Sequence, residues 1–112
     1  MNFTQEIVND ILFIDIEGDL LGVNNELKLM DYINEHVEER IVRCAIDISK
    51  VNYMNSTGLS LLIRVLTRFR NRNGEVVLIN PSESVAKLLV ITKLNAIFTI
   101  VKTREEAMKA LK

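Results

Sequence analysis

Hydrophobic residues in this chain follow two alternating spacings. From Ile11 to Ile16 they form an almost continuous apolar run, which predicts a buried strand. An edge strand is expected before it, from about Phe3 to Val8, with Asn9-Asp10 as the turn between the two. The run at 76–79 is short and wholly apolar, as is typical of a central strand covered on both faces. Further strands are expected at 42–48 and 98–101.

Segments with helical spacing separate these strands. The first helix should be capped by Asn24 or Asn25, and its apolar face comprises Leu27, Met30, Ile33, Val37 and Ile41. The second should run from about Ser56 to Asn71 and end at Asn73-Gly74, because glycine adopts the left-handed conformation without steric cost. The residues that it is expected to bury are Leu59, Leu62, Ile63, Leu66 and Phe69.

Two shorter helices complete the predicted fold. Ser82 or Ser84 should open the third, which turns Val85, Leu88 and Leu89 inward. Thr103 and Glu106 have the spacing of a capping box, in which each side chain binds the other's backbone amide, and the last helix carries Ala107, Met108 and Leu111. Strands that alternate with helices predict an α/β fold, with a mixed sheet of about five strands and about four helices packed on it. Its first hairpin should be antiparallel.

Composition narrows the functional classes. A chain of 112 residues with 48% hydrophobic residues fits one domain, residues 1–112. A net charge of −1 gives no support for direct binding to nucleic acid or an anionic membrane. The apolar runs are too short to insert across a membrane, and the first residues lack the pattern of a signal peptide. A single cysteine suits a reducing compartment, so we expect a cytoplasmic protein.

One local charge bias interrupts this balance. Arg64, Arg68 and Arg72 are spaced by four on the second predicted helix, with Arg70 nearby. Such a row is most often a solvated face opposite the core. The alternative is a basic edge that meets an acidic patch on a protein partner.

Residues that could carry catalysis are isolated from one another. His36 is the only histidine, Cys44 stands in an apolar strand, and no glycine-rich phosphate loop is present. Asp47 also stands in that strand and should accept hydrogen bonds near its end, because an unpartnered buried carboxylate is costly. We therefore expect neither an enzyme nor a bound metal or cofactor.

The hinge between the strand at 42–48 and the second helix holds the most informative chemistry. It reads Asn55-Ser56-Thr57-Gly58, so two hydroxyls lie where a helix begins. A helix start has unpaired backbone amides and a partial positive charge, which would stabilise a phosphate on Ser56. An unmodified Ser56 could instead serve only as the helix cap. Both interpretations remain open at this point.

The residues around the hinge resemble a known family. The segment from Asp47 to Leu59 (Asp-Ile-Ser-Lys-Val-Asn-Tyr-Met-Asn-Ser-Thr-Gly-Leu) is similar to the signature of the STAS domain, a module of bacterial anti-sigma factor antagonists and sulphate transporter tails. Gly18-Asp19-Leu20 resembles the family's turn after the second strand, Gly74 its glycine before the fourth, and the segment 88–98 its third-helix region. The likeness extends over essentially the whole chain, and a stand-alone domain of this length is similar to the antagonists.

This resemblance implies a switch. In such proteins the serine in the position of Ser56 is phosphorylated by the anti-sigma factor, which is itself a serine kinase. The unphosphorylated antagonist binds that kinase and frees the sigma factor, and a serine phosphatase resets the cycle. Thr57 is the second candidate for modification. The implied partner-binding patch around Ser56 comprises Leu20, Leu21, Val23, Asn24, Tyr53, Met54, Asn55, Thr57, Gly58 and Leu59.

One residue departs from the family pattern. The family usually has an aspartate immediately before the serine, and this chain has Asn55. Asparagine is a good helix cap, so the fold is not affected, but a negative charge beside the hydroxyl is lost. The resemblance therefore leaves two functions open. One is the phosphorylation-controlled antagonist, and the other is a constitutive STAS subunit of a transport or sensory complex.

Overall fold

The computed structural model describes residues 2–21 and 26–111 and contains five strands, four α-helices and one short 3₁₀-helix. The strands are β1 (Asn2–Val8), β2 (Ile11–Glu17), β3 (Arg43–Lys50), β4 (Glu75–Ile79) and β5 (Thr99–Val101). The helices are α1 (Glu26–Glu38), α2 (Ser56–Arg70), α3 (Glu83–Ile91), η1 (Leu94–Ala96) and α4 (Arg104–Ala110). The predicted α/β class and the order of elements are confirmed.

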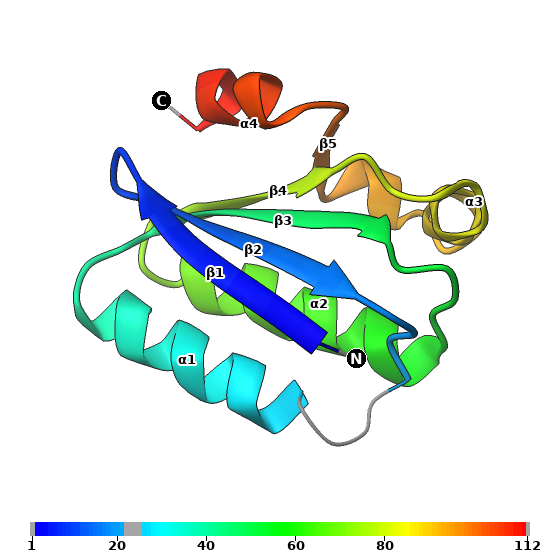
Figure 1. The fold of residues 1–112 in the computed structure, drawn as a ribbon, viewed down its shortest axis with the longest axis horizontal. Helices are drawn as coiled ribbons and strands as arrows, with labels where there is room; N and C mark the ends of the chain where they lie inside the picture. The colour runs from blue at the N-terminus through cyan, green and yellow to red at the C-terminus, as the bar shows by residue number, and fades with distance from the viewer. Residues whose placement is uncertain (1, 22–25, 112) are drawn as a thin grey trace.

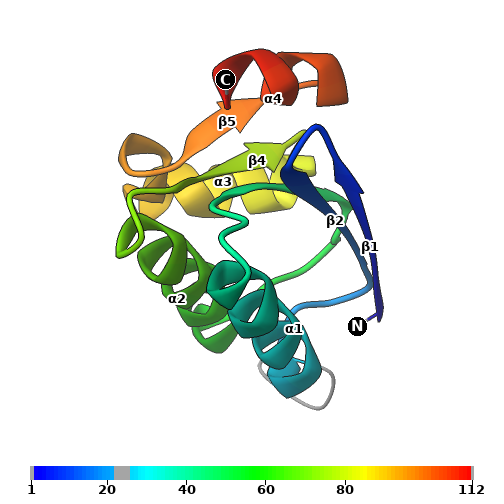
Figure 2. The ribbon, with the colours of Figure 1, turned by 90° about the vertical axis from the view of Figure 1, so that its left-hand side faces the viewer.

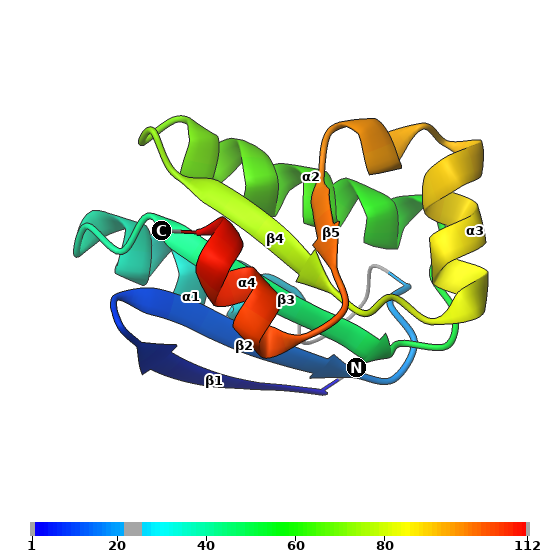
Figure 3. The same cartoon turned by 90° about the horizontal axis from the view of Figure 1, so that it is seen from above.

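The five strands form one mixed sheet in the order β1-β2-β3-β4-β5 (Figure 3). β1 and β2 pair antiparallel through the turn at Asn9 and Asp10, which both have positive φ, and the other neighbours pair parallel. The expected antiparallel first hairpin is therefore confirmed. Because β2, β3 and β4 run in the same direction, their carboxyl ends meet at one edge of the sheet.

Helices cover the two faces of the sheet unequally. α1 and α2 lie side by side against one face, and α4 lies against the other (Figures 1 and 2). The face under α1 and α2 presents Ile14, Ile46 and Leu78, and the face under α4 presents Phe13, Ala45 and Val77. β4 is buried from Val76 to Ile79, as predicted for a strand covered on both faces.

The first helix departs from its predicted pattern in the residues that it buries and in where it ends. The expected caps Asn24 and Asn25 lie outside the described residues, as does the side chain of Leu27. Leu29, Ile33 and Val37 form the buried face, while Met30 is half-buried. Ile41 follows the helix because Arg40 has a φ of 70° and ends it.

The second helix buries a broader face than its spacing predicted. Leu59, Leu62, Leu66 and Phe69 are buried as expected, but so are Leu61 and Val65, whereas Ile63 is only half-buried. α2 contacts both α1 and β4, so more than one stripe of its surface faces apolar neighbours. A single stripe of helical spacing could not reveal this second contact.

The end of α2 corrects a second expectation. Asn73, with a φ of 62°, takes the left-handed conformation that was assigned to Gly74. Gly74 has another role, since a Cβ there would lie 2.0 Å from the carbonyl oxygen of Val42. The glycine is needed for the close approach of two chain segments.

The caps of α3 and α4 also differ in detail. Ser82 precedes α3, but its hydroxyl donates to the carbonyl of Val51 (2.7 Å) and does not cap the helix. The Thr103 hydroxyl accepts from the amide of Glu106 (3.1 Å), as predicted. The Glu106 carboxylate, however, accepts from the amide of Lys102 (2.7 Å) and not from the amide of Thr103. Half of the expected capping box is therefore present.

Candidate functional site

The candidate site lies at the amino end of α2, beyond the carboxyl ends of β2 and β3 (Figure 1). Two segments distant in sequence meet there, because Leu20 and Met54 form a parallel bridge. The Leu20 amide donates to the carbonyl of Tyr53 (3.0 Å), and the Asn55 amide donates to the carbonyl of Leu20 (3.3 Å). These bonds fix the backbone that leads into the helix.

Asn55 is the cap of α2. Its backbone is extended (φ −103°, ψ −177°), and its Oδ1 accepts from the amide of Gly58 (2.9 Å). Its Nδ2 donates to the carbonyl of Leu21 (3.1 Å). An aspartate at this position could make the first bond but not the second, because a carboxylate has no hydrogen to donate. The asparagine thus links the helix start to the segment after β2.

Ser56 is the first residue of α2 and is exposed, as is Thr57. The interpretation of Ser56 as the helix cap is wrong, because Asn55 fills that role. Within the part of the chain that the structure describes, the Ser56 hydroxyl has no hydrogen-bond partner, and the amides of Ser56 and Thr57 have none either. The hydroxyl is therefore exposed at the positive end of a 15-residue helix, beside amides that no described residue pairs.

Gly58 is buried against the neighbouring segment. A Cβ on this residue would lie 2.1 Å from the carbonyl oxygen of Leu20 and 3.0 Å from the Met54 side chain. The glycine of the hinge motif is thus explained by packing, because only a residue without a side chain lets Leu20 cross the first turn of α2 this closely.

The structure divides the predicted contact patch into exposed and buried residues. The side chains of Leu20, Met54 and Leu59 are in the hydrophobic core, so they support the site from beneath. Tyr53, Ser56 and Thr57 are exposed, and Asn55 and Leu21 are half-buried. Val23 and Asn24 lie outside the described residues. The sequence could not separate these sets, because each of the buried residues is covered by segments far away in the chain.

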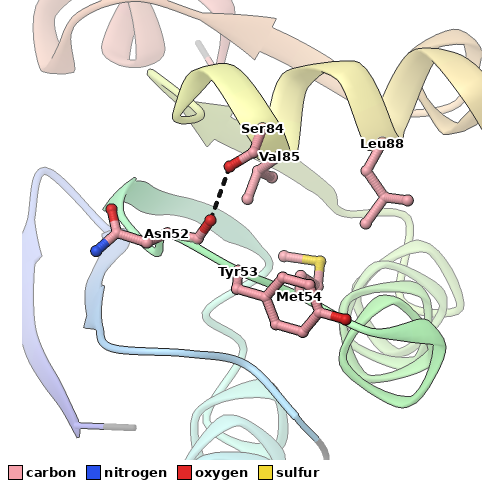
Figure 4. A pocket seen from close by; sticks show the side chains of 6 residues that line it. All are labelled: Asn52, Tyr53, Met54, Ser84, Val85 and Leu88. Carbon is pink, nitrogen blue, oxygen red and sulfur yellow. Dashed lines mark hydrogen bonds between the residues drawn. The ribbon is translucent and has the colours of Figure 1, made fainter.

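A cleft beside the site was not anticipated from the sequence. It has a volume of about 220 Å³ and lies between the hinge and α3 (Figure 4). The Ser84 hydroxyl closes one end by donating to the carbonyl of Asn52 (2.7 Å), and the Tyr53 side chain, 58% exposed, flanks it. The side chains that line the cleft are Asn52, Tyr53, Met54, Ser84, Val85 and Leu88.

The other candidate residues are accounted for by the fold. Cys44 is buried, and this burial raises the pKa of its thiol. His36 lies against the Tyr32 ring, and its Nδ1 is 2.9 Å from the Tyr32 carbonyl oxygen. Asp47 accepts from the amide and hydroxyl of Ser49 (2.9 and 2.6 Å), as expected for a carboxylate near a strand end.

Within residues 2–21 and 26–111, no group of three or more histidine, cysteine or carboxylate residues could hold a metal ion. No described helix combines the length and the apolar character needed to cross a membrane.

Comparison with known proteins defines the family. The sequence profile of the STAS domain matches residues 2–107, so the chain belongs to the STAS domain family. A protein of Bordetella bronchiseptica assigned as an anti-sigma factor antagonist, BtrV, is 26% identical over 112 residues, which are 100% of this chain and 96% of the relative.

Solved structures show the same fold. A protein of Thermotoga maritima assigned as an anti-sigma factor antagonist matches with a TM-score of 0.88 and 23% identity, over 97% of this chain and 93% of that one. The Bacillus cell fate determinant SpoIIAA in its phosphorylated form matches with a TM-score of 0.79 and 19% identity, over 99% and 100% of the two chains. At these identities the likeness shows the fold.

Proposed function

We propose that this protein is an anti-sigma factor antagonist that binds an anti-sigma factor kinase through the face around Ser56 and is released when Ser56 is phosphorylated. Family membership and the names of its relatives support the antagonist role. A serine phosphatase would return the protein to its binding state. Both steps would take place in the cytoplasm, with no direct contact between this chain and nucleic acid.

The observation that carries the proposal is the position of the Ser56 hydroxyl. It is exposed at the first residue of α2, and the neighbouring residue Asn55 caps the helix in its place. Phosphorylation of Ser56 would therefore not remove a hydrogen bond on which the helix start depends. Thr57 is also exposed and is the second candidate acceptor.

The physical effect of the phosphate would fall on the partner. A phosphate adds a charge of about −1.5 to −2 at neutral pH. The positive end of α2, with first-turn amides that no described residue pairs, can accommodate this charge without refolding. Burying the same charge in a protein–protein interface without a matching cation costs several kcal/mol, which corresponds to orders of magnitude in affinity. One modification can therefore prevent docking while the fold stays intact.

A kinase assay with the cognate anti-sigma factor tests the proposal. The protein and two variants, Ser56→Ala and Thr57→Ala, are incubated with the kinase and Mg-ATP, and the products are mapped by mass spectrometry. Calorimetry then compares the affinity of the kinase for each unmodified and modified protein. We expect one phosphate on Ser56, none on Ser56→Ala, and an affinity at least about a hundredfold lower after phosphorylation.

The same assay distinguishes the constitutive alternative. The replacement of the usual aspartate by Asn55 is the observation that favours it, because the charge beside the hydroxyl is missing. A STAS subunit of a transport or sensory complex would bind its partner with Ser56 unmodified. Tight binding together with no phosphate on Ser56 or Thr57 would contradict the switch and support that alternative.

A further inference from the structure

A groove between α1 and α2 is lined by charged, polar and apolar side chains that take no part in the face around Ser56. It has a volume of about 410 Å³ and lies on the flank of the two helices. Met30 and Ile63, both half-buried, supply apolar side chains, and Arg64, Thr67 and Arg68 supply polar ones. Asn34 and Asn71 complete the lining.

The arginines along this groove are only partly neutralised within the protein. Arg68 donates to Asn34 Oδ1 (2.7 Å) and lies 3.5 Å from the carboxylate of Glu38, and the same carboxylate is 4.0 Å from Arg72. Arg64 is exposed, and no carboxylate of residues 2–21 or 26–111 forms a salt bridge with it. One glutamate thus pairs with two of these arginines, and no described carboxylate pairs with Arg64. Arg70, by contrast, is used inside the fold, because it bonds to Glu75 and to the carbonyl of Ile97.

From this charge pattern we propose that the α1/α2 groove binds an acidic amphipathic helix of a partner protein. Residues four apart on a helix are about 6 Å apart along its axis. Arg64 and Arg68 therefore form a row with this repeat along α2, and Arg72 extends it in the turn just after the helix, which ends at Arg70. Carboxylates at every fourth position of a second helix match this repeat. Apolar side chains between those carboxylates would meet Met30 and Ile63, as in other helix-in-groove complexes.

The apolar component and the limited charge favour a protein segment over nucleic acid. A phosphate backbone binds through many cations and gains nothing from half-buried apolar side chains. The whole chain has a net charge of −1, and the groove already contains Glu38. The proposal is independent of Ser56, which precedes Arg64 by about two helical turns.

Peptide binding to the full chain tests the proposal. The probe is a fluorescein-labelled helical peptide with glutamate at every fourth position and leucines between them, and the control peptide has lysine in place of glutamate. We expect saturable binding of the acidic peptide only, with amide shifts in ¹⁵N spectra confined to α1 and the outer face of α2. Raising the salt concentration from low to molar should weaken binding of the acidic peptide at least about tenfold.

Three variants should affect binding of the acidic peptide in different ways. Arg64→Glu should weaken binding at least about tenfold, because it reverses the exposed cation of the row. Glu38→Gln should tighten binding severalfold, because it frees Arg68 and Arg72 from their internal carboxylate. Lys109→Glu makes the same charge change on α4, across the sheet, and should alter binding less than about twofold. Thermal unfolding of each variant verifies that the fold is retained, and Arg64→Ala replaces Arg64→Glu if that variant does not fold.

Several results would overturn the proposal. These are no saturable binding of the acidic peptide, equal binding by Arg64→Glu and wild type, or shifts that map outside the groove. Equal or tighter binding of a DNA duplex at the same arginines would assign the row to nucleic acid instead. Ser56→Asp should leave peptide binding unchanged. A negative result in the peptide test would therefore not bear on the phosphorylation switch, and a negative result for the switch would not bear on the groove.

Discussion

The backbone of Gly58 is in direct contact with the carbonyl group of Leu20, so that a methyl group on Gly58 would lie 2.1 Å from the Leu20 oxygen. This contact joins the first turn of α2 to the segment after β2. It fixes the backbone on which Asn55 and Ser56 are placed.

Gly58→Ala should therefore destabilise the protein. Alanine favours helices over glycine by about 0.5–1 kcal/mol, but here the added carbon overlaps backbone atoms that cannot rotate away, and overpacking costs about 1–3 kcal/mol. Urea unfolding measures the net change. Thr67→Ala, at an exposed position of the same helix, is the control and should change stability by less than about 0.5 kcal/mol. A Gly58→Ala protein as stable as wild type would show that the Leu20 segment moves aside freely.

Substitutions at Asn55 and Ser56 should have unequal effects on stability. Asn55→Ala removes the bonds to Gly58 and Leu21 and should cost about 1 kcal/mol, whereas Ser56→Ala should cost less than about 0.5 kcal/mol because the serine hydroxyl does not cap the helix. Asn55→Asp keeps the cap but loses the donor to Leu21, so its stability should lie between those of Asn55→Ala and Ser56→Ala. Chemical denaturation of the three variants gives the order, and a larger loss for Ser56→Ala than for Asn55→Ala would contradict this assignment.

Charge at Ser56 should control binding to the anti-sigma factor. Ser56→Asp places one negative charge where the phosphate would be, and the positive helix end tolerates it, so the fold should be retained. We expect its affinity for the kinase to fall at least about tenfold in calorimetry. Ser60→Asp, one turn further along α2 and also exposed, is the positional control. If Ser56→Asp binds as tightly as wild type, charge does not regulate this face.

Asp15 should make folding stability depend on pH. Partial desolvation and the nearby Asp47 carboxylate raise the pKa of Asp15 above its ordinary value of 3.8. The folded state then holds this proton more tightly than the unfolded state, so stability falls as the pH rises from 3.8 through the raised pKa and stays lower above it. Asp15→Asn should increase stability at neutral pH by less than about 1 kcal/mol, since the residue is exposed, and the gain should vanish below pH 3.8. Unfolding curves across this range, with Asp31→Asn as control, measure the difference, and a gain that does not change with pH would exclude this cause.

Cys44 should be chemically inert in the folded protein. Its side chain is buried, and the raised pKa of the thiol leaves almost no thiolate, which is the reactive form. A disulfide reagent such as DTNB should react at least about a hundredfold more slowly with the folded protein than with the urea-unfolded protein. Rapid labelling under native conditions would show that β3 opens readily.

Local patterns predicted most of the architecture. The apolar run at 11–16, the turn at Asn9-Asp10 and the position of the second helix each depend on neighbouring residues, and each is confirmed. Cap details were harder to predict. Asn55 and Ser56 are both good caps by residue type, and only the approach of Leu21 and Gly58 to the Asn55 side chain distinguishes them.

Local patterns were enough to predict the order of strands and helices and to place two hydroxyls at the start of α2, because periodicity and turn chemistry act over a few residues. Which hinge residues face the solvent depends instead on packing between distant segments. Leu20 and Met54 are buried while Tyr53 and Ser56 are exposed, because the β2 end, the hinge and α3 cross one another at this edge of the sheet. Burial depends on contacts between residues such as Asn55 and Leu21, which are 34 positions apart, and no local pattern encodes such a contact.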